Sequence, residues 1–172
     1  MNCERIIETI SIQCDALRAH ILAASVQLTD YTRRLNQIVK QIQKNIDVRD
    51  LAFAEEFNIY CANLRAHLDT LEPVWTNLRA QAREQKEWNG SLTLETKKLN
   101  SRAKALSRAC DEFTTAYDLF NKQYTRFTAA KLSVWLLTSC QTDIANLTGK
   151  ILFLAREISR KTEQNRIPHA NG

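Results

Sequence analysis

The stretch from residue 7 to residue 42, IETISIQCDALRAHILAASVQLTDYTRRLNQIVKQI, decides the fold class of this 172-residue chain. Apolar side chains recur in it at alternating intervals of three and four residues. The members of this series are Ile7, Ile10, Cys14, Leu17, Ile21, Ala24, Leu28, Tyr31, Leu35, Ile38 and Ile42. This spacing keeps side chains on one face of an α-helix, so it predicts a helix over about residues 3–45 with one continuous apolar seam.

Three later segments carry the same spacing. Their seams run from Phe57 to Leu78, from Leu99 to Phe127 and from Leu137 to Ile158. They predict helices over about residues 50–88, 93–126 and 130–164, followed by a frayed tail at residues 166–172. The dipeptide at 89–90, Asn-Gly, separates the second helix from the third. No Gly or Pro separates the third helix from the fourth. The fourth seam, however, lies one position away from the frame that the third seam predicts, and a turn between two helices causes such a displacement.

Four segments of similar length with short connections favour an up-down-up-down four-helix bundle, with residues 1–165 as one domain. The alternative is a three-helix or extended coiled coil, in which the third and fourth helices are continuous and the seams are buried between chains. A β fold is excluded because 3 Gly and 2 Pro supply too few turn residues.

The chain shows no sign of membrane insertion or export. Its longest stretches without a charged residue span 11 residues, whereas a membrane-spanning helix needs about 20 apolar residues. The first five residues, MNCER, lack the basic-then-apolar layout of a signal peptide. We therefore expect an intracellular, cytoplasmic protein whose 5 cysteines are free thiols rather than disulfides.

Two octets resemble each other and invite a metal-site hypothesis. Residues 14–21, CDALRAHI, and residues 61–68, CANLRAHL, share the Cys and His that zinc accepts as ligands. If the first two helices reflect about a turn centred near residue 47, however, His20 lies opposite roughly residue 75 and His67 opposite roughly residue 28. The two histidines then lie several turns apart, so we predict no metal site. His67 is interpreted as a histidine of the core or its boundary.

Reflection about turns centred near residues 90 and 129 places Cys61 and Cys140 at nearly one level of the bundle, on diagonal helices. Diagonal helices are too far apart for a disulfide, whose Cβ atoms must approach within about 4.5 Å. The two thiols are therefore predicted to be small core side chains rather than a redox switch.

The sequence contains no catalytic motif. It has no Ser/His/Asp arrangement, no Glu-x-x-His pair, no Gly-rich phosphate loop and no Cys-x-x-Cys. The seams also offer few polar side chains that could converge on a substrate. We expect a non-enzymatic protein with no catalytic residues, no cofactor and no small-molecule substrate.

Basic residues are concentrated at one predicted end of the bundle, the end where the second helix stops, the third starts and the fourth stops. Residues 79–108 hold eight Lys and Arg against three Glu, and residues 150–166 hold five against two. We call this end the basic pole; its candidate polyanion-binding residues are Arg79, Arg83, Lys97, Lys98, Arg102, Lys104, Arg108, Arg156, Arg160 and Lys161. Such a charge distribution attracts anionic partners, although it also serves solubility.

The opposite end is apolar. Consecutive apolar residues at the start of the fourth helix cannot all face one core, so some of them are exposed or cap the bundle. We call this end the apolar pole; its candidate partner-binding residues are Leu132, Val134, Trp135 and Leu136.

Two functions follow from the two poles. The first hypothesis is an adaptor or scaffold module that binds a protein partner, or a second copy of itself, through the apolar pole. The alternative is a protein that binds nucleic acid or an anionic membrane through the basic pole.

Overall fold

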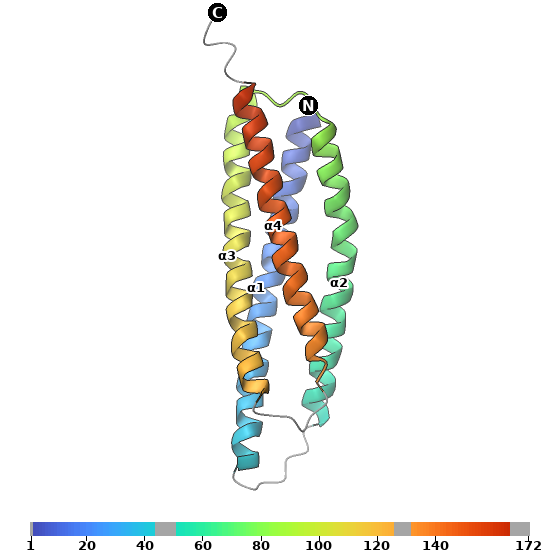
Figure 1. Ribbon diagram of the computed structural model, residues 1–172, viewed down its shortest axis with the longest axis vertical. Coiled ribbons are helices and arrows are strands. Elements are labelled where there is room, and N and C mark those ends of the chain that lie inside the picture. The colour runs from blue at the N-terminus through green and yellow to red at the C-terminus, as the bar shows by residue number, and fades with distance from the viewer. Residues whose placement is uncertain (1, 44–50, 126–131, 166–172) are drawn as a thin grey trace, which may run out of the picture.

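The computed structural model describes residues 2–43, 51–125 and 132–165 (Figure 1). It contains four long helices, α1 (Asn2–Gln43), α2 (Leu51–Glu84), α3 (Thr93–Tyr124) and α4 (Val134–Gln164), and a short 3-10 helix, η1 (Gly90–Leu92). Successive long helices run in opposite directions, which confirms the up-down-up-down bundle. Because α3 and α4 are separate, the alternative with one continuous helix is wrong. The turns predicted near residues 47 and 129 and the frayed tail at 166–172 lie outside the described residues.

Polar contacts between α1 and α3 reveal how the helices are arranged around the bundle. The Arg102 Nε atom lies 3.3 Å from Asp15 Oδ2. The Gln123 side chain donates a 2.7 Å hydrogen bond to Asn36 Oδ1, across 87 residues of sequence. Residue numbers rise together in the two pairs and with the same separation, so α1 and α3 are parallel neighbours. The connection from α2 to α3 therefore crosses the bundle diagonally.

Helices α2 and α4 are likewise parallel neighbours. Arg65 Nη1 donates to Ser139 Oγ at 2.8 Å, and Arg83 Nη2 donates to Glu157 Oε1 at 3.1 Å. The prediction that the second and fourth helices are diagonal is therefore wrong. It assumed that each helix packs mainly on those next to it in sequence, whereas side-chain packing here places α3 between α1 and α4.

The predicted seams form the core. Every seam residue of α1 from Ile7 to Ile38 is buried, as are the seam positions of α3 from Leu99 to Phe113. Aromatic rings fill the lower half of the bundle: the Phe57 and Phe120 rings stack with centroids 4.8 Å apart and an interplanar angle of 6°. Two rings from two helices thus join α2 to α3 across the diagonal.

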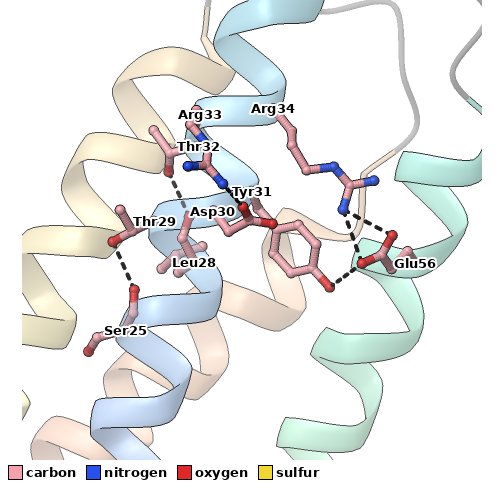
Figure 2. A network of polar contacts seen from close by, with 9 residues as sticks. All are labelled: Ser25, Leu28, Thr29, Asp30, Tyr31, Thr32, Arg33, Arg34 and Glu56. Atoms are coloured by element: carbon pink, nitrogen blue, oxygen red, sulfur yellow. Dashed lines mark hydrogen bonds and ion pairs between the residues drawn. The ribbon is translucent and has the colours of Figure 1, made fainter.

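A polar cluster ties α1 to α2 beside these rings (Figure 2). Arg34 Nη1 donates to both carboxylate oxygens of Glu56 at 3.0 Å, and the Tyr31 hydroxyl donates to Glu56 Oε1 at 3.5 Å. The Arg34 guanidinium also lies over the Phe53 ring, 5.2 Å from its centroid. These contacts hold the start of α2 against residues 31–34 of α1, whereas α1 itself continues to Gln43.

Trp88 closes the opposite end of the core. Helix α2 ends at Glu84 rather than at residue 88, and the chain that follows turns the Trp88 side chain inward, leaving it 1% exposed. Its Nε1 atom donates to the Ala82 carbonyl at 3.2 Å, and its own carbonyl accepts a hydrogen bond from Asn165 at the end of α4. One tryptophan therefore joins the ends of α2 and α4 next to the start of α3.

The five cysteines are free and buried, as predicted. Burial raises the pKa of Cys14 and of Cys61 to about 12 and that of Cys140 to about 11, so these thiols stay protonated near neutral pH. Among the described residues, no helix is long and apolar enough to cross a membrane.

Candidate functional site

Four helix ends meet at the basic pole. Figure 1 places the start of α1, the end of α2, the start of α3 and the end of α4 at the same end of the bundle. Lys161 is half-buried, and the other nine candidate residues are exposed: Arg79, Arg83, Lys97, Lys98, Arg102, Lys104, Arg108, Arg156 and Arg160. The fold thus brings the predicted basic residues of three helices together on the surface.

The basic residues of α3 follow the helix period. Lys97, Lys104 and Arg108 are separated by seven and four residues, which places them on one face of α3. That face is opposite the buried positions Leu99 and Leu106, so these three cations point away from the core. A linear stripe of this kind extends the positive surface along the bundle and suits an extended anionic partner.

Two of the ten cations also brace the fold. Arg83 pairs with Glu157 at 3.1 Å and Arg102 pairs with Asp15 at 3.3 Å, each from one helix to another. Exposed pairs of this type contribute about 0.2–1 kcal/mol. Within the described part of the chain the other eight candidates form no ion pair, so their charges are available to a ligand.

The buried position of Trp88 limits what the basic pole can recognise. Base stacking requires an exposed aromatic face, and Trp88 packs inside the bundle instead. Trp88 therefore offers no stacking face, whereas Phe153 of α4, between Lys150 and Arg156, is 54% exposed.

The apolar pole is less uniform than its sequence suggests. Leu132 is buried, and Val134 and Leu136 are partly buried against the core. Trp135, by contrast, is 71% exposed. The structure therefore leaves one of the four predicted residues, Trp135, accessible to a partner.

Sequence reasoning missed one exposed apolar residue at the level of Trp135. Ile59 on α2 is largely exposed and follows Asn58, whose Oδ1 atom accepts a 2.6 Å hydrogen bond from the backbone N–H of Ser133. Ile59 and Trp135 consequently lie at one level of neighbouring helices. Ile59 lies outside the second seam, and its level relative to Trp135 follows only from the packing of α2 beside α4.

His20 and His67 lie against each other, which corrects the predicted separation. Their ring centroids are 4.2 Å apart, with the planes tilted by 43°. The prediction assumed that the adjoining ends of the first two helices are flush. Because His67 rather than residue 75 lies beside His20, α2 is shifted along α1 by about eight residues, or two turns. In Figure 1 the lower end of α1 accordingly extends beyond the start of α2.

The histidine pair is a contact between α1 and α2. No group of three or more His, Cys, Asp and Glu side chains suited to a metal ion occurs in residues 2–43, 51–125 and 132–165. The Nε2 atom of His67 is buried without a hydrogen-bond partner in that same part of the chain. Burial, and secondarily the neighbouring His20, lower the pKa of His67 below its ordinary value of 6.5.

This lowered pKa predicts acid sensitivity. The unfolded chain takes up a proton on His67 near pH 6.5, whereas the folded protein resists protonation until a lower pH. The free energy of unfolding should therefore decrease as the pH falls below about 6.5. Urea unfolding from pH 7 to pH 5 tests this: His67→Asn should show a shallower decrease than the wild type. Equal slopes would contradict a contribution from His67.

Comparisons of the chain with protein-family models, with curated proteins and with solved structures find no match.

Proposed function

We propose that the protein is a non-enzymatic binding module that holds a polyanion, such as nucleic acid or an anionic membrane surface, at its basic pole. The observation that carries the proposal is the exposure of nine of its ten candidate cations at one end of the bundle. Of the four candidate residues at the apolar pole, only Trp135 is comparably exposed. The geometry therefore favours the basic pole over the apolar one.

The mechanism is electrostatic. The chain has a formal net charge of +5 and a pI near 9.0, and its excess positive charge lies toward one end. Clustered cations raise the local concentration of an anionic partner and speed its encounter with the protein. Each cation that neutralises a phosphate releases condensed counterions, so binding weakens steeply as salt is added.

Charge removal on α3 tests the proposal. Lys97, Lys98, Lys104 and Arg108 are exposed and form no ion pair among the described residues, so replacing all four with Gln leaves the interhelical pairs intact. For a labelled 20-mer duplex, we expect the slope of log K against log salt to become shallower by up to about 4. Vesicles containing anionic lipid, assayed in parallel, distinguish a membrane surface from nucleic acid as the partner.

A matched control separates a local site from overall charge. Lys40→Glu combined with Gln37→Glu and Gln41→Glu removes the same net charge from exposed positions at the far end of α1. This control should retain most of the wild-type affinity. Equal losses in the two proteins would mean that net charge alone determines binding and would contradict a site at the basic pole.

A second candidate function is docking of a protein partner at the apolar pole. It is supported by Trp135, which is 71% exposed and has exposed Ile59 at the same level of the neighbouring helix. Tryptophan is enriched among the residues that dominate binding energy at protein interfaces. In this function the protein acts as an adaptor, and the basic pole serves solubility.

A further inference from the structure

A long groove runs between α1 and α3. It consists of two adjoining hollows of about 600 and 540 Å³, which share Thr29, Arg33, Ala116 and Leu119 among their lining residues. On the α1 side the lining extends from Ser25 to residue 36, roughly 16 Å at 1.5 Å per residue. This length corresponds to about three turns of a helix.

The groove is more apolar than its sequence suggests. Figure 2 shows the hydroxyl groups on this side of α1 turned back onto their own helix: Thr29 Oγ1 donates to the Ser25 carbonyl at 2.9 Å, and Thr32 Oγ1 to the Leu28 carbonyl at 2.9 Å. Because these hydroxyls are already satisfied, covering them costs little. Val26, 72% exposed, and Leu119, 57% exposed, add apolar surface.

The charges along the groove are ordered. Since α1 and α3 are parallel with an offset of 87 residues, Glu112 lies level with Ser25, and Lys122 lies level with Leu35. Glu112 and Lys122 are both exposed and neither forms an ion pair among the described residues. Between them, Asp30 and Arg33 also line the groove and pair with each other, so the unpaired charges are an acid at one end and a base at the other.

We propose that this groove is a self-association surface, on which a second copy of the chain packs in the antiparallel direction across a two-fold axis. Such an axis brings each unpaired acid opposite the partner's unpaired base, namely Glu112 opposite the partner subunit's Lys122 and Lys122 opposite the partner subunit's Glu112. The occupant is thus specified by charge complementarity, because a two-fold interface must be complementary to itself.

The same axis can be placed along the groove. The midpoint between Glu112 and Lys122 lies at Tyr117, and an antiparallel two-fold axis at that level sets α3 on the partner's α3 and α1 on the partner's α1. Leu119, which lines both hollows two residues from this level, then lies close to its own copy.

The lining of this groove includes none of the residues that define the two poles, so the experiment is independent of the proposed function. We expect sedimentation equilibrium across a concentration series to show a monomer–dimer equilibrium for the wild type. Leu119→Lys should make the protein monomeric, because it buries a charge on the axis-facing surface. Ile12→Lys, at a similarly exposed position of α1 (59%), and Trp135→Ser should leave the dimer intact.

Charge exchange tests the symmetry itself. Glu112→Lys or Lys122→Glu alone should weaken dimerisation by about tenfold, because each places like charges together twice per dimer. The double variant with both substitutions should restore the wild-type dissociation constant. A wild-type protein that is monomeric throughout, a dimer abolished by Trp135→Ser but not by Leu119→Lys, or a double variant as weak as the single ones would overturn the proposal.

Discussion

Replacing Trp88 with Ala should lower the free energy of unfolding by about 3–5 kcal/mol, the range for truncating a large buried aromatic side chain. The side chain is 1% exposed and donates to the Ala82 carbonyl. Its removal opens a cavity where the ends of α2 and α4 meet the start of α3. The loss should be measured by urea unfolding followed by circular dichroism.

Two matched variants make this prediction specific. Trp135→Ala removes the same side chain from a position that is 71% exposed, and it should change stability by less than about 0.5 kcal/mol. Trp88→Phe keeps most of the apolar volume but loses the hydrogen bond, so its loss should be intermediate. If Trp88→Ala and Trp135→Ala had equally small effects, Trp88 would not close the core.

Phe120→Ala should cause a loss of similar size, about 3–5 kcal/mol. Phe120 is fully buried and stacks on Phe57 across the diagonal of the bundle, so truncation leaves a cavity at the level where α2 and α3 approach. Phe153→Ala, at a largely exposed position of α4, is the control and should have a small effect. Equal effects of the two substitutions in urea unfolding would contradict the burial of the third seam.

The fold class was predictable because the apolar period leaves few alternatives. A seam such as that of α1 can be buried only against other helices, and four seams of similar length fill one bundle. The separation of α3 from α4 was predictable for a related reason: the fourth seam, which begins at Leu137, lies one position out of the frame set by the third.

The lateral order and axial stagger of the helices were not predictable. Periodicity states which face of a helix is buried but not which helix covers it, so the pairing of α1 with α3 could not be read from the sequence. The shift of α2 along α1 is set by packing around Tyr31 and Glu56, far apart in sequence. The prediction assumed that the adjoining ends of α1 and α2 are level, and it therefore placed His20 far from His67. Their ring centroids are 4.2 Å apart.

The candidate sites also combine features that were predictable from the sequence with features that were not. Off-seam cations such as Lys97, Lys104 and Arg108 were expected on the surface because they lie opposite seam positions of α3, and they are exposed. The apolar pole was harder, since its consecutive apolar residues do not reveal which of them packs inward; Leu132 does and Trp135 does not. The groove between α1 and α3 exists only because these two helices are neighbours in the bundle, so it could not be predicted from the sequence.

Salt-dependent binding of the wild-type protein to a 20-mer duplex is the most direct test of the central claim that the basic pole holds a polyanion. The account predicts measurable affinity at low salt and a steep linear decrease of log K with log salt, with a slope of about −0.9 for each phosphate neutralised. Negligible binding to both duplex and anionic vesicles at every salt concentration would contradict it. The exposed Trp135 would then be the better-supported site, and the basic pole a solubility feature.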